Sequence, residues 1–167
     1  MRNIYFAIIL CFFVNASFAQ NVAIVNGKAI EDKEFMWFYK KNHSGNANVS
    51  YSDLLAYLNL YIDFKLKVLD AIALKMDRDT AYLTEIKNYE DALNSQKRHS
   101  KKSPEHNYLV NEYKEAVLLF NISEVKVWNK AQGDAAQKTL ELEWIEGLRK
   151  RYPVKIFEEQ IRKMAKP

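Results

Sequence analysis

Residues 21–35 read NVAIVNGKAIEDKEF, which predicts a strand, a tight turn at Asn26 and Gly27, a second strand and the start of a helix. A lone two-stranded hairpin is marginally stable in water, so another part of the chain must complete the sheet. The segment VKIF, residues 154–157, alternates like a short strand and follows Pro153, which ends the helix before it. We therefore expect residues 153–157 to form a C-terminal strand that pairs the two ends of the chain.

Between these ends the sequence predicts helices. The first has an acidic initial turn, which the helix dipole favours, and it carries the apolar run FMWFY, residues 35–39. The expected helices cover 31–44, 52–76, 79–98, 107–131 (as one helix or two), 134–151 and a last amphipathic turn or two. The predicted fold class is mainly α, a helical core with a small sheet formed by the N-terminal hairpin and the C-terminal strand.

The longest predicted helix, residues 52–76, is apolar on two nearly opposite sides. One stripe consists of Leu55, Leu58, Ile62, Leu66, Leu69, Ala73 and Met76. The other consists of Tyr57, Tyr61, Phe64, Val68 and Ile72. Two interpretations stay open: a central helix packed on both faces, or an aromatic stripe that is partly open and contacts another polypeptide.

The first 19 residues have the pattern of a cleavable export signal. Arg2 precedes an almost unbroken apolar run over residues 4–14, and Ser17-Phe18-Ala19 fits a small-x-small cleavage site. The apolar run is shorter than the roughly 20 residues that a membrane-spanning helix needs. We expect cleavage after Ala19, no permanent membrane anchor, and a single domain over residues 20–167. The only cysteine, Cys11, would be lost with the signal, which leaves no thiol for catalysis, a disulfide or a metal.

No catalytic or metal-binding motif stands out. The basic stretch 97–106, KRHSKKSPEH, predicts a solvated linker loop because it has no periodicity and no interleaved aromatic residues. The three histidines, His43, His99 and His106, fall in predicted polar loops without the spacing of metal ligands. The net charge of +4 is only mildly basic and does not indicate nucleic-acid binding. We expect no cofactor, no metal and no enzyme activity.

Four segments together resemble a known family: 22–42 (VAIVNGKAIEDKEFMWFYKKN), 54–77 (LLAYLNLYIDFKLKVLDAIALKMD), 112–131 (EYKEAVLLFNISEVKVWNKA) and 143–156 (EWIEGLRKRYPVKI). They are similar to segments of SurA-like periplasmic chaperones, which often carry parvulin-type peptidyl-prolyl isomerase domains. The resemblance implies a chaperone core in which the N-terminal domain folds together with a C-terminal helix and strand. It also implies an isomerase domain inserted within this core. Only Gln132 and Gly133 separate Ala131 from Asp134, and the linker 97–106 is also too short to hold such a domain. We therefore expect a chaperone core without the parvulin domain.

The expected function is therefore that of a periplasmic chaperone or holdase without catalysis, which binds unfolded or nascent envelope and outer-membrane proteins. The chain has 9 Phe, 3 Trp and 10 Tyr, more than a core of this size needs. An open apolar surface suits a protein that binds unfolded chains. The candidate client-binding residues are Trp37, Tyr57, Tyr61 and Phe64, with plain core packing as the alternative for each. Two other functions stay open. One is an assembly subunit that binds a fixed partner, such as a full-length isomerase homologue or a second copy; the other is residual prolyl isomerisation.

Overall fold

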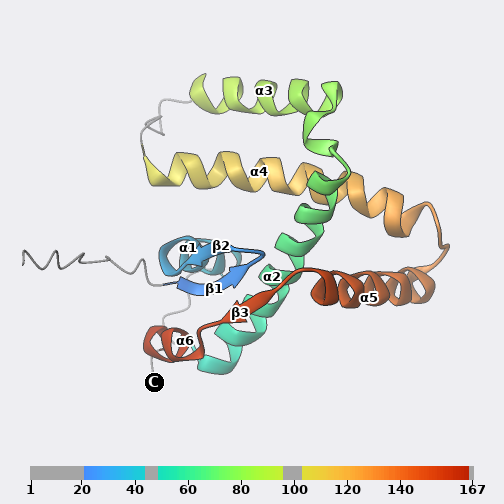
Figure 1. Ribbon diagram of the computed structural model, residues 1–167. Helices are drawn as coiled ribbons and strands as arrows, with labels where there is room; N and C mark the ends of the chain where they lie inside the picture. The colour runs from blue at the N-terminus through green and yellow to red at the C-terminus, as the bar shows by residue number, and fades with distance from the viewer. Residues whose placement is uncertain (1–20, 44–48, 96–102, 166–167) are drawn as a thin grey trace, which may run out of the picture.

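The computed structural model describes residues 21–43, 49–95 and 103–165. The predicted signal peptide over 1–19, its cleavage site and residues 97–102 of the predicted linker lie outside these ranges. The described chain is mainly helical with one three-stranded antiparallel sheet, so the predicted fold class is confirmed (Figure 1).

The sheet joins the two ends of the described chain. Strands β1 (Asn21–Val25) and β2 (Lys28–Glu31) form the hairpin, and Asn26 and Gly27 between them have φ angles of 47° and 78°. Positive φ at both central residues is what a two-residue hairpin turn of this twist requires, and Asn-Gly tolerates it best. Strand β3 (Val154–Ile156) pairs with the other side of β1, in the order β2-β1-β3. The predicted closure of the sheet by the C-terminal strand is therefore confirmed.

The predicted strand over 153–157 is longer than the three residues of β3, yet its flanks also bond to β1 and to the turn after it. The Asn26 N–H donates to the Pro153 carbonyl at 2.8 Å, and the Phe157 N–H donates to the Val22 carbonyl at 2.9 Å. These two bonds hold both ends of β3 in register beside β1.

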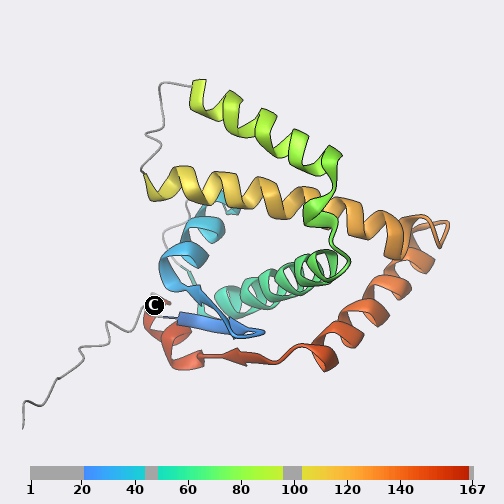
Figure 2. The same ribbon diagram turned by 45° about the horizontal axis from the view of Figure 1, so that its top comes forward.

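Helix α2 (Tyr51–Ala73) runs through the middle of the molecule (Figure 2). Around it lie the sheet and four helices, which are α1 (Asp32–Asn42), α4 (Pro104–Ser123), α5 (Asp134–Arg151) and α6 (Glu158–Met164). Its buried residues come from both predicted stripes, with Leu58 and Leu66 from one and Tyr61 and Val68 from the other. The helix is thus central and packed on both faces, although Tyr57 and Phe64 are only half-buried.

The predicted end of the long helix at Met76 is wrong by one turn. Lys75 adopts a left-handed conformation with φ 61°, which stops the helix after Ala73. A short 3-10 helix, η1 (Met76–Arg78), then leads into α3 (Thr80–Ser95). Asp79 caps α3, because its Oδ1 accepts a hydrogen bond from the Ala81 N–H at 2.8 Å.

The predicted linker over 97–106 is wrong at its end, because residues 104–106 are already helical. The Ser103 side chain accepts a hydrogen bond from the His106 N–H at 3.1 Å, and Pro104 is the first residue of α4. Serine followed by proline is a favourable helix start, but the basic composition upstream masked it. His106 is consequently buried in a helix and not in a polar loop, whereas His43 is exposed at the end of α1.

Helix α4 continues without a break into a π-helix, η2 (Glu124–Trp128), in which the Asn129 N–H donates to the Glu124 carbonyl at 3.0 Å. The expected helical stretch 107–131 is therefore one continuous rod. Helix α5 then begins after Gly133, whose φ is 82°. Among the described residues, no helix combines the length and the apolar composition needed to cross a membrane.

Candidate functional site

Three of the four candidate client-binding residues lie together in a groove between α1, α2 and α4. The groove has a volume of about 240 Å³, below the roughly 300–1,000 Å³ typical of small-molecule sites, and it suits one or two side chains of a polypeptide. We call it the aromatic groove; it is lined by Phe38, Asn42, Tyr57, Leu60, Tyr61, Phe64, Glu112 and Ala116.

The spacing of residues along α2 puts their side chains on the groove. Tyr57, Tyr61 and Phe64 are four and three residues apart, so they share one face of the helix. The ring centroids of Tyr57 and Tyr61 are 6.5 Å apart, and those of Tyr61 and Phe64 are 5.9 Å apart. Phe38 of α1 closes the other wall, with its ring centroid 5.2 Å from that of Tyr61. These distances fall within the range of favourable aromatic contacts, so the rings form a fixed ladder.

The side chains that line the groove differ sharply in their exposed fraction. Leu60 is 67% exposed, which is unusual for a leucine beside three aromatic rings. Tyr57 and Phe64 are half-buried and offer ring surface to the groove. Tyr61 is only 6% exposed and forms the floor, which agrees with the alternative of core packing for this residue. The groove is therefore an apolar surface with a rigid base and one leucine that no other side chain covers.

Trp37 lies outside the aromatic groove. Its ring contacts the ring of Phe38 edge-on at 4.9 Å and that of Tyr108 of α4 at 5.5 Å. The Lys41 amine lies 5.3 Å from the centre of the indole ring. The half-buried Trp37 thus helps to pack α1 against α4 and does not line the groove with the other three candidates.

Polar side chains form the rim of the groove. The Asn42 side-chain amide donates to the Tyr57 hydroxyl at 2.8 Å and to the Phe38 carbonyl at 3.0 Å. Lys41 of α1 pairs with Glu112 of α4 and bridges the two helices beside the groove. Burial raises the pKa of Tyr57, against the opposing effect of the Asn42 hydrogen bond, so the phenol is neutral near pH 7.

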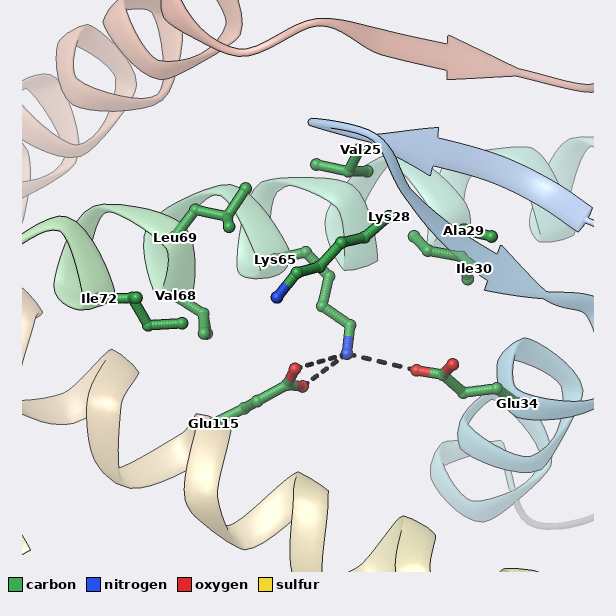
Figure 3. Close-up of a pocket in the computed structure, with 10 residues that line it drawn as sticks. All are labelled: Val25, Lys28, Ala29, Ile30, Glu34, Lys65, Val68, Leu69, Ile72 and Glu115. Carbon is green, nitrogen blue, oxygen red and sulfur yellow. Dashed lines mark hydrogen bonds and ion pairs between the residues drawn. The ribbon is translucent and has the colours of Figure 1, made fainter. Parts of the chain in front are cut away.

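A charged cluster contacts the groove floor, and Figure 3 shows its Glu34, Lys65 and Glu115 side chains. The Tyr61 hydroxyl donates to Glu34 Oε1 at 2.7 Å. The Lys65 amine lies between two carboxylates, 2.6 Å and 2.8 Å from the Glu115 oxygens and 3.3 Å from Glu34 Oε1. The cluster therefore joins α1, α2 and α4, the same three helices that form the groove.

Burial shapes the protonation of this cluster. It raises the pKa of Glu115, and the neighbouring Lys65 charge offsets part of that effect. Burial and the Glu34 carboxylate raise the pKa of Tyr61 far above its ordinary value, so its hydroxyl stays protonated as a donor. The small cavity of about 120 Å³ beside the cluster is lined by Lys28 and by apolar residues of β1, β2 and α2 (Figure 3).

The sequence interpretation missed several groove residues. Leu60 could have been found, because it lies three residues from Tyr57 and four from Phe64 on the same helix face. Glu112 and Ala116 carried no such signal, since their place depends on how α4 crosses α2. Within the described ranges, no group of three or more His, Cys, Asp or Glu side chains is placed to hold a metal ion.

No known protein family, curated protein or solved structure matches this chain. The similarity to SurA-like chaperones therefore stays a prediction from the four quoted segments.

Proposed function

We propose that this chain is an exported holdase, a chaperone that binds unfolded polypeptides and prevents their aggregation without catalysis. Its clients are apolar segments of unfolded envelope proteins, outer-membrane proteins among them, and its compartment is the periplasm. The observation that carries the proposal is the exposed Leu60 beside the half-buried Tyr57 and Phe64 in the aromatic groove.

The energetics of the groove suit a transient binder. Full burial of a leucine side chain contributes about 1.5–3 kcal/mol, and the half-buried rings add further apolar area. Association and ordering of a flexible segment cost several kcal/mol, so a single groove of this size supports weak and reversible binding. A holdase needs such binding, because a client that is held too tightly does not go on to fold.

The rim supports a polypeptide as the ligand. Apolar side chains of an extended segment would enter the groove, while its backbone amides would face the Tyr57 hydroxyl and the Glu112 carboxylate. Both groups keep acceptor capacity beyond the hydrogen bonds that they already make. A segment without net charge suits this rim, because Glu112 is already paired with Lys41.

The test compares two exposed leucines by light scattering. An unfolded outer-membrane β-barrel protein is diluted into buffer with and without the purified chain. We expect the wild-type chain to suppress aggregation at near-stoichiometric ratios and Leu60→Ser to reduce the suppression several-fold. The matched control is Leu83→Ser, which alters a leucine of α3 that is 53% exposed and lies outside the groove. It should keep the wild-type effect.

Two results would contradict the proposal. Equal losses from both leucine variants would mean that suppression comes from general surface hydrophobicity and not from the groove. No suppression by the folded wild-type chain would rule out general chaperoning, and would favour an assembly subunit whose groove holds one fixed partner.

A further inference from the structure

A second apolar hollow lies beyond the aromatic groove, between α2, α4, η2 and α5. Its volume is about 320 Å³. Its most prominent feature is an aromatic pair, Phe120 and Trp128, which are 54% and 43% exposed and meet at a ring angle of 69° with centroids 5.1 Å apart. We call it the distal hollow; it is lined by Lys67, Ala116, Leu119, Phe120, Ser123, Val127, Trp128 and Glu141.

The π-turn of η2 builds this exposed pair. In an unbroken α-helix, residues eight apart lie about 80° from each other around the axis. The hydrogen bond from the Asn129 N–H to the Glu124 carbonyl encloses one residue more than an α-helical bond does. This extra residue rotates the following residues back around the axis by up to about 100°. Trp128 therefore lies nearly above Phe120 on one side of the rod. The same turn buries Val127 and directs the Lys126 amine to Asp70, which keeps the turn in place.

The two hollows are neighbours that share one lining residue, and we treat them together as a channel along α2 and α4. Ala116 lines both of them, and its small side chain leaves the passage open. Along α2, Leu60 and Phe64 of the groove are followed by Lys67 of the distal hollow at the next turn of the same face. Along α4, Glu112 of the groove and Ser123 of the distal hollow likewise share the face of Ala116.

The charges of the distal hollow are balanced within the protein. Lys67 is buried and pairs with Glu141 of α5, and its amine lies 5.5 Å from the centre of the Trp144 ring. No net charge is left to attract an anion or a cation. The lining thus favours the same kind of ligand as the aromatic groove, an uncharged apolar segment.

We propose that the distal hollow is a second subsite for the client polypeptide, which lies extended along the channel, crosses Ala116 and packs against Phe120 and Trp128. This inference rests on the proposed function. From Glu112 to Ser123 the channel follows α4 for roughly 17 Å at 1.5 Å per residue. An extended chain covers that length in about five residues, so a four-residue segment, about 13 Å long, does not span both subsites, whereas a ten-residue segment does.

The test uses two capped, fluorescently labelled peptides of alternating leucine and serine, four and ten residues long, with binding measured by fluorescence anisotropy. We expect the ten-residue peptide to bind the wild-type chain at least about tenfold more tightly. The double variant Phe120→Ser/Trp128→Ser should remove this advantage and leave the Kd of the four-residue peptide unchanged. The control Leu142→Ser, at an exposed position of α5 that lines neither hollow, should change neither Kd.

The outcomes separate this inference from the proposed function. If the double variant leaves the ten-residue Kd unchanged while Leu60→Ser weakens both peptides, the second subsite is wrong and the proposed function stands. If neither peptide binds the folded wild-type chain, both are wrong. Self-association of the wild-type chain in analytical ultracentrifugation that the double variant abolishes, with no effect on either peptide, would assign the aromatic pair to a second copy and overturn the inference.

Discussion

Replacing Asp70 by alanine should loosen the attachment of α5 and η2 to the central helix. Asp70 is 2% exposed, and its carboxylate accepts from three donors that lie outside α2. The Trp144 indole N–H donates at 2.9 Å, and the Lys126 amine and the Arg151 guanidinium are each 3.1 Å away. Because α5 buries only Leu148, this carboxylate is a main link between α5 and the core.

The three donors determine how much free energy of unfolding Asp70→Ala should remove. A hydrogen bond to a charged acceptor contributes about 1.5–3 kcal/mol, and without Asp70 the indole N–H loses such a partner. Lys126 is partly exposed and Arg151 is mostly exposed, so solvent screening limits their ion pairs to about 1 kcal/mol together. We expect Asp70→Ala to lower the free energy of unfolding by about 3 kcal/mol. For a chain of this size that is a decrease of roughly 6–12 °C in Tm.

Urea denaturation followed by circular dichroism measures this loss, and a double-mutant cycle isolates its main part. Trp144→Phe keeps the aromatic ring and removes the N–H, so its coupling with Asp70→Ala should be about 1–2 kcal/mol. Arg151→Ala serves as the control and should cost less than about 1 kcal/mol. A loss below about 1 kcal/mol for Asp70→Ala, or no coupling to Trp144, would refute the assignment of this carboxylate as the link.

Two further substitutions test the cluster behind the aromatic groove. Tyr61→Phe should lower the free energy of unfolding by about 1.5–3 kcal/mol in urea denaturation, because it removes a hydrogen bond to the Glu34 carboxylate. Peptide affinity should not change, since the ring is retained. An unchanged free energy of unfolding would contradict the role of the hydroxyl. The raised pKa of Glu115 means that, from its ordinary value of 4.5 up to the raised value, the folded chain holds a proton that the unfolded chain has lost. This group therefore makes the wild-type chain less stable as pH rises through that window. Glu115→Gln should remove its contribution to the slope of the free energy of unfolding against pH, measured by urea denaturation between pH 4 and 7, whereas an identical slope would contradict the assignment.

The features that the sequence predicts correctly depend on local rules. Asn26 and Gly27 form a turn that few other residue pairs allow. The closure of the sheet by the C-terminal strand follows because an isolated hairpin is not stable. The errors are local as well. Lys75 ends α2 early in a conformation that lysine rarely adopts, and the helix start at Ser103 was concealed by its basic context.

The candidate site could be predicted only in part, because periodicity identifies a helix face but not what covers it. The spacing of Tyr57, Tyr61 and Phe64 put all three on one face, as the structure has them. Which of them is exposed depends on where α1 and α4 cross α2. That geometry buries Tyr61, leaves Leu60 open and directs Trp37 to a different neighbour. The π-turn that pairs Phe120 with Trp128 has no simple sequence signal at all.

Ion pairs fix the spacing between the walls of the groove. The Lys41–Glu112 pair spans α1 and α4 at the rim, and the cluster of Glu34, Lys65 and Glu115 spans the same two helices behind the floor. Moving α1 toward α4 to cover Leu60 would require these charges to be displaced or buried further, and the desolvation cost opposes the gain from burying the leucine. A groove that is already formed spares an incoming segment the cost of opening it, so only the costs of association and of ordering the segment oppose the gain from apolar burial. The polar cluster thus stabilises the fold and also maintains the apolar surface on which the proposed binding depends.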